Sequence, residues 1–69
     1  MEELALQGRE NIRLCDLLKL AGFCETSGVG KNIIADGVVK VDGKVELRKR
    51  AKIIAGQVIE YAGKKVKVV

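Results

Sequence analysis

The sequence contains no histidine, no proline and no tryptophan among its 69 residues. Without histidine the commonest general base at neutral pH is missing, and a zinc site lacks one of its two usual ligand types. The two cysteines, Cys15 and Cys24, are too few for a disulfide framework, and no activating base lies near either in sequence. The glycines occur singly and form no phosphate loop. We therefore expect no catalytic site, metal or cofactor, and two free, reduced thiols.

Aromatic residues are scarce as well, since Phe23 and Tyr61 are the only two. Aliphatic side chains must therefore fill the core of a single small domain spanning residues 1–69, which buries about 60% of the surface that its unfolded chain exposes. No apolar run approaches the roughly 18 residues of a membrane span, and the acidic N-terminus lacks the form of a signal peptide. The sequence therefore predicts a cytoplasmic protein without a membrane segment.

Positive charge is concentrated in the second part of the chain. Residues 1–30 carry three basic and five acidic side chains, a net charge of −2, whereas residues 31–69 carry ten basic and four acidic ones, a net charge of +6. This distribution is typical of proteins that bind a polyanion, here RNA, DNA or an anionic membrane. A solvated face that merely keeps the protein in solution explains the charge equally well. A membrane is disfavoured because no amphipathic helix carries the basic residues on its polar face.

A first helix is predicted from about residue 12 to residue 21. Its apolar residues recur at the helical period, and they are Leu14, Leu17, Leu18 and Ala21. Asn11 is a plausible N-terminal cap, and Gly22 lies just past the end, where a left-handed residue commonly terminates a helix.

A second helix is predicted between a cap at Thr26 or Ser27 and about Asp36, with Gly37 ending it. Its apolar positions are Val29, Ile33 and Ile34. Gly30 is unfavourable inside a helix by roughly 1 kcal/mol relative to alanine, which indicates a close approach of the two helices. With a loop of about four residues between them, the helices form an αα-hairpin.

After Gly37 the apolar period changes from 3.6 to 2, which indicates strands. Asp42 and Gly43 predict a tight turn. A two-residue loop mixes polar and apolar residues on both faces, so we favour an odd-length loop with Gly43 in the left-handed conformation. That loop places three apolar residues on one face, Val39, Val45 and Leu47, and puts Lys40 and Lys44 together on the opposite face.

The rest of the chain predicts a basic run and two more strands. Residues 48–52, Arg-Lys-Arg-Ala-Lys, form the basic run, and Ile53 and Ile54 return to the core. Residues 58–61 and 65–68 are strands joined by a turn. Residues 1–8 are expected to be an irregular or edge segment. The order of elements is that of an α+β domain.

The basic residues of this half gather on the predicted hairpin and on the segment after it, at Lys40, Lys44, Arg48, Lys49, Arg50 and Lys52. Lys31, in the second helix, extends the same surface if the hairpin packs beside that helix. Such a cluster attracts phosphates and releases counterions. The near absence of aromatics disfavours single-strand readers that stack bases, so we expect recognition of the backbone and shape of structured RNA.

Three motifs in register resemble the RNA-binding domain named after ribosomal protein S-four. Residues 13–18 match its Arg-Leu-x-x-Leu-Leu, residues 37–43 its glycine followed by Val-x-Val-Asp-Gly, and residues 56–59 its Gly-Asp/Gln-x-Ile turn. Order and spacing match from about residue 12 to residue 60. The runs Leu-Cys-Asp-Leu-Leu-Lys-Leu, Val-Lys-Val-Asp-Gly and Arg-Lys-Arg are similar to those of small stand-alone bacterial members called YbcJ-like.

The resemblance implies an αα-hairpin, the αL motif, packed on a small, mostly antiparallel sheet of three to five short strands. It also implies RNA binding across the second helix and the hairpin. The RNA-binding residues expected on these grounds are Arg13, Lys31, Lys40, Lys44, Arg48, Lys49, Arg50 and Lys52.

Two departures from the family matter. Many members have Ser-Arg where this chain has Thr26-Ser27, which removes one phosphate contact, and Lys49 replaces a usual proline while Arg50 adds charge.

The partner expected is ribosomal or transfer RNA, with ribosome association as one setting, and the protein is expected to be a monomer. The alternative is a protein–protein adaptor that docks an acidic partner, with residues 65–69 as an open sheet edge.

Overall fold

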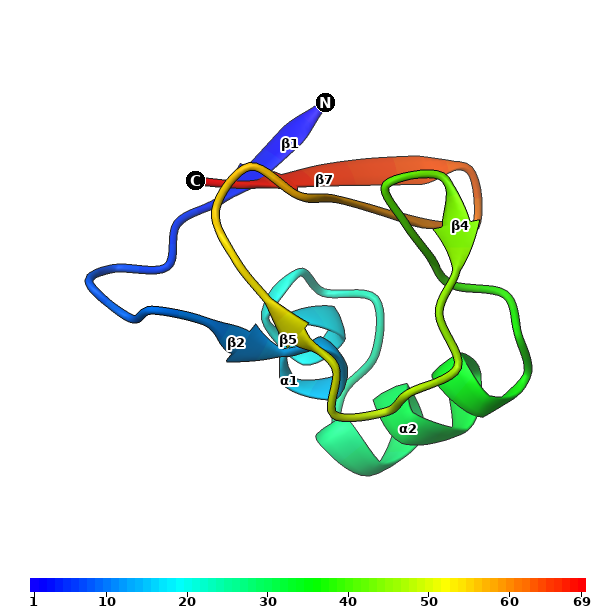
Figure 1. Cartoon of the computed structure of the whole chain (residues 1–69). Coiled ribbons are helices and arrows are strands. Elements are labelled where there is room, and N and C mark those ends of the chain that lie inside the picture. The colour runs from blue at the N-terminus through cyan, green and yellow to red at the C-terminus, as the bar shows by residue number, and fades with distance from the viewer.

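The computed structural model describes residues 1–69, which fold into two helices and seven short strands. The elements in chain order are β1 (Glu2–Leu4), β2 (Ile12–Arg13), α1 (Leu14–Leu20), α2 (Ser27–Ala35), β3 (Lys40–Val41), β4 (Lys44–Val45), β5 (Lys52–Ile53), β6 (Val58–Tyr61) and β7 (Lys64–Val68). The helices lie on one side of the molecule and the larger sheet on the other, with the β2–β5 pair between them (Figure 1). The predicted α+β class and αα-hairpin are confirmed.

The larger sheet has the strand order β1-β7-β6-β3-β4. Its pairs are antiparallel except for β1, which runs parallel to β7 with Leu4 opposite Val68. The expectation of an open edge at residues 65–69 is therefore wrong, because β7 lies between β1 and β6. The N-terminal segment covers that edge: Val69 N donates to Leu4 O at 2.9 Å, and Leu6 is buried. The edge strands are β1 and β4.

Helix α1 begins at Leu14, later than predicted, because residues 12 and 13 pair with β5. Asn11 is therefore not the N-terminal cap, and the residue that takes this place, Arg13, makes no side-chain capping bond. The end was predicted correctly. Gly22 follows the helix with φ +81°, and Phe23 N donates back to Leu18 O at 3.0 Å, the bond that closes a left-handed helix terminus.

Helix α2 follows its predicted course from the Thr26 cap to Gly37. The Thr26 hydroxyl accepts a hydrogen bond from Val29 N at 3.2 Å, which satisfies one of the free N–H groups of the first turn. Ile34 is fully buried, but Val29, another apolar position of this helix, is 47% exposed. Neither helix has the length and apolar character that crossing a membrane requires.

The predicted close approach of the helices occurs at Gly30, which is buried against α1. A Cβ at this position would lie 2.9 Å from the backbone oxygen of Cys15 and 3.4 Å from the Cys24 Sγ. A backbone oxygen moves only if the helix moves with it, so glycine sets the distance between α1 and α2.

Replacing Gly30 by alanine is expected to destabilise the protein by up to about 2 kcal/mol. Overpacking of about 1–3 kcal/mol outweighs the gain in helix propensity of at most about 1 kcal/mol. Gly28→Ala is the matched control, since its Cβ would meet only the Thr26 hydroxyl at 3.7 Å, and we expect it to stabilise by about 0.4–1 kcal/mol. Urea unfolding measures both, and a stabilising Gly30→Ala would show that the helices do not need this contact.

The β3–β4 hairpin has a two-residue loop, so the odd-length loop favoured from the sequence is wrong. Lys40 pairs with Val45 and Val41 with Lys44. Both loop residues have positive φ, 52° at Asp42 and 84° at Gly43, the combination that matches the twist of a tight hairpin. The Asp42 carboxylate also accepts a hydrogen bond from Val58 N at 3.0 Å, which fixes the loop to β6.

This register changes which side chains share a face of the hairpin. Directly opposed residues lie on the same face, so Lys40 and Lys44 point to opposite faces instead of sharing one. Val45 and Leu47, expected in the core beside the buried Val39, are exposed. Val45 lies on β4, an edge strand with a neighbour on one side only, and Leu47 follows this strand.

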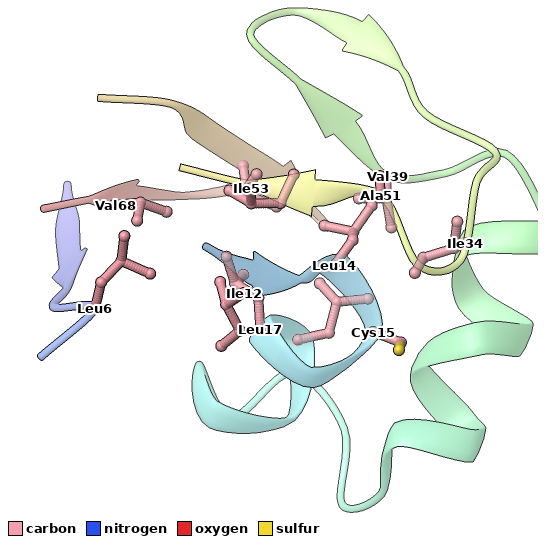
Figure 2. Close-up of a cluster of buried hydrophobic side chains, with 12 residues drawn as sticks. Leu6, Ile12, Leu14, Cys15, Leu17, Ile34, Val39, Ala51, Ile53 and Val68 are labelled. Carbon is pink, nitrogen blue, oxygen red and sulfur yellow. The ribbon is translucent and has the colours of Figure 1, made fainter. Parts of the chain in front are cut away.

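The core is aliphatic, as predicted, and lies between α1, the β2–β5 pair and the inner face of the sheet (Figure 2). Its members come from every part of the chain, including Leu6, Leu17, Ile34, Ile53 and Val68. Ile54 is exposed and was wrongly assigned to the core.

Candidate nucleic-acid interface

Backbone hydrogen bonds hold the basic run on the N-terminus of α1. The first N–H groups of any helix lack partners within it. In α1, Leu14 N donates to Ala51 O at 2.9 Å and Cys15 N donates to Lys49 O at 3.2 Å. A segment distant in the sequence thus pairs with the N–H groups that Asn11 was expected to cap. The same hydrogen bonds place the basic run at the start of the helix.

Lys49 and Arg50 occupy the two central positions of a turn within this run. Ala51 N donates to Arg48 O at 3.2 Å, which closes the turn. Both central side chains are exposed, whereas Ala51 is buried beneath them. The backbone is therefore tied to the core while the two charges are presented to solvent.

Arg13 and Lys52 join this region through the small two-stranded sheet. They are direct partners across β2 and β5, and the neighbouring pair, Ile12 and Ile53, is buried. Because alternate residues of a strand face opposite sides, Arg13 and Lys52 share the exposed side. Arg13 Nε donates to Asp16 Oδ2 at 3.0 Å, so its charge is partly compensated.

An open depression of about 450 Å³ lies in the same region. It is lined by Arg48, Arg50, Ala51 and Lys52. Three of its four lining residues are therefore cationic, and Ala51 supplies a small apolar surface.

Arg48 is held by Glu46, a residue that the sequence analysis did not single out. The Glu46 carboxylate accepts hydrogen bonds from Arg48 Nη2 at 2.9 Å, from Arg48 Nε at 3.2 Å and from the Arg48 backbone N at 3.2 Å. The side-chain hydrogen bond with Arg48 lowers the pKa of Glu46 and raises the pKa of Arg48. An acidic residue two positions before an arginine was the signal available in the sequence.

The remaining predicted residues are Lys31, Lys40 and Lys44, which lie outside the basic run and the β2–β5 pair. Lys31 follows Gly30, which packs on Cys15, and Cys15 N donates to Lys49 O, so α2 and the basic run both contact Cys15 of α1. Lys40 lies on the outer face of the sheet opposite Glu60. Lys44 lies on the face that bears Val41. The structure thus gathers most of the predicted cluster but separates the two hairpin lysines from each other.

We use the name α1 basic surface for Arg13, Arg48, Lys49, Arg50 and Lys52 together. The two ion pairs of the protein both involve members of this surface, Arg13 with Asp16 and Arg48 with Glu46. Lys49, Arg50 and Lys52 have no acidic partner. A compact group of exposed, unpaired cations on a fixed backbone is the kind of surface that binds phosphates.

Comparison with known families and structures agrees with this architecture. A family model for the S4 domain matches residues 4–69, so the chain belongs to the S4-domain family. The matched residues extend at both ends beyond residues 12–60, the part in which the sequence motifs resemble the family.

Two curated proteins are 51% identical to this chain over 69 residues, covering 100% of it and 99% of their own length. They are "Putative RNA-binding protein YbcJ" of Escherichia coli (strain K12) and "Uncharacterized protein YbcJ" of Shigella flexneri. The solution structure of YbcJ from E. coli, described as revealing an αL motif involved in RNA binding, matches with a TM-score of 0.77 and 51% identity. It covers 100% of this chain and 87% of that one, which confirms the αL fold predicted here.

Proposed function

We propose that this protein is a non-catalytic module that binds structured RNA, ribosomal or transfer RNA, through the α1 basic surface. The observation that carries the proposal is the anchoring of residues 48–52 on the first N–H groups of α1, which presents three unpaired cations from a fixed backbone. Membership of the S4-domain family and the name of the E. coli relative, "Putative RNA-binding protein YbcJ", support RNA binding as the function.

The mode of binding follows from the residue types. Lysine and arginine neutralise phosphates and release counterions, which gives affinity without reading bases. A rigid arrangement of cations selects among RNAs by the spacing of their phosphates, so shape decides specificity. The surface is complete within one chain, and we propose that one copy is sufficient.

Lys31, Lys40 and Lys44 take flanking roles in this proposal. Lys31 follows Gly30, which packs on the α1 residue that is bonded to the basic run, whereas the two hairpin lysines point to opposite faces of the sheet. An RNA lying on one face contacts one of the hairpin lysines directly. Each of these three residues is therefore expected to contribute less than Lys49 or Arg50.

The test is the salt dependence of binding to a structured RNA, measured by fluorescence anisotropy with transfer RNA and with a ribosomal RNA hairpin. Neutralising three phosphates gives a slope of about −3 in a plot of log affinity against log salt, at about 0.9 per phosphate. An unstructured single strand of equal length is the control and should bind more weakly. A flat salt response, or equal affinity for the unstructured strand, would contradict the proposal.

A further inference from the structure

Arg48 differs from the other cations of the α1 basic surface in how it is held. Its side chain is 80% exposed, yet its Nε and Nη2 atoms both donate to the Glu46 carboxylate, at 3.2 and 2.9 Å. Two parallel bonds from one edge of a guanidinium fix the plane of the group as well as its position. The third bond, from the Arg48 backbone N to Glu46 Oε2, ties the same carboxylate to the main chain. Arg48 is thus a flat, oriented group with open faces.

The charge of this pair makes Arg48 a poor phosphate ligand. The Glu46 carboxylate compensates the guanidinium and repels a phosphate brought beside it. Lys49, Arg50 and Lys52 carry no such partner and suit phosphates better. A nucleic-acid base is planar and uncharged, so the Glu46 carboxylate does not repel it. The plane of an arginine guanidinium stacks well on the face of such a base.

The depression beside Arg48 has room for such a group. Its volume of about 450 Å³ lies within the range of roughly 300–1,000 Å³ typical of small-ligand sites. Arg48 lines it together with two unpaired cations, Arg50 and Lys52, and with the apolar surface of Ala51. The depression thus offers one planar group to stack on a base and two positive charges to bind the flanking phosphates. These are the groups that binding of a single nucleotide requires.

We propose that this depression binds one unstacked nucleotide of the RNA, with its base on the Arg48 plane and its phosphates on Arg50 and Lys52. Glu46 is the positioning residue that orients the plane. The inference rests on the proposed function and narrows its substrate class, because a continuous duplex has no free base face to offer. The preferred RNA therefore contains an unpaired nucleotide, in a bulge, a loop or at a helix end.

The experiment compares a fully paired RNA duplex with the same duplex carrying one unpaired 2-aminopurine, a base whose fluorescence reports stacking. The wild-type protein is expected to bind the bulged RNA about five- to tenfold more tightly, in line with the stacking of one base, and to change its fluorescence. Arg48→Lys keeps the charge and removes the plane. The variant should bind the bulged RNA and the paired duplex with equal affinity, and the fluorescence change should be lost.

The Glu46→Gln variant distinguishes a role of Glu46 in positioning the Arg48 plane from an effect of its charge alone. Removing the carboxylate raises the net charge by one and should tighten binding to both RNAs, but the preference for the bulge should fall because the plane is no longer held. A simple electrostatic role predicts equal gains for both RNAs, which would overturn the inference. Equal wild-type affinity for the two RNAs with a steep salt response would also overturn it, yet leave the proposed function standing. Binding to neither RNA would remove both.

Discussion

The double variant Lys49→Ala/Arg50→Ala is expected to bind structured RNA at least tenfold more weakly than the wild type. These two residues hold the central positions of the turn at residues 48–51, where their charges have no acidic partner. Each phosphate contact that is lost should lower the steepness of the salt dependence by about one, so the slope should fall by about two. Anisotropy titrations at several salt concentrations measure both quantities.

The double variant Lys65→Ala/Lys67→Ala is the matched control, because it removes the same charge from the outer face of the sheet. Both lysines are exposed on β7, opposite Glu60 and Val58. This control should change affinity by less than about threefold through its effect on net charge. Equal losses in the two double variants would mean that the total charge, and not the α1 basic surface, determines binding.

Leu17→Ala is expected to lower the free energy of unfolding by about 2–5 kcal/mol. The Leu17 side chain is fully buried on α1, in the cluster that joins this helix to the β2–β5 pair and to the sheet. Its removal loses transfer free energy and leaves a cavity. Small domains have total stabilities of about 5–15 kcal/mol, so this loss is a large fraction of the whole. Urea unfolding followed by circular dichroism measures it.

Leu20→Ala serves as the control for this variant, because Leu20 lies in the same helix but is 53% exposed. We expect its effect to remain within about 0.5 kcal/mol, as for most surface substitutions. Similar losses for the two leucines, or a loss below about 1 kcal/mol for Leu17, would show that the core does not depend on α1 in the way described. Because Leu17 does not contribute to the α1 basic surface, RNA binding by the folded fraction should be retained.

The elements set by local chemistry were predictable from the sequence. The Thr26 cap, the glycine termini at Gly22 and Gly37 and the close contact at Gly30 each follow from the conformations that one residue allows. The start of α1 was not predictable in this way. It depends on hydrogen bonds from Leu14 and Cys15 to carbonyl groups about 35 residues later in the chain, which no local pattern reveals.

The hairpin shows why the candidate site was predicted only in part. The sequence named the basic residues, but a change of one residue in loop length moves a side chain to the other face of a sheet. The preference for burying Val45 and Leu47 favoured the odd loop, whereas the positive φ values of Asp42 and Gly43 and the bond from Val58 N stabilise the two-residue turn. Tertiary structure therefore determines which face of the sheet each hairpin lysine occupies.

Nuclear magnetic resonance of the ¹⁵N-labelled protein during titration with a structured RNA would locate the RNA-binding surface directly. We expect the largest shift changes on the amides of residues 48–52 and on Arg13, Leu14 and Cys15. The latter three adjoin the run through β2–β5 pairing and hydrogen bonds to its carbonyls. Residues 64–68, on the far side of the molecule, should change little. Shifts concentrated on β7, or spread evenly over all exposed lysines, would contradict the α1 basic surface as the site of RNA binding.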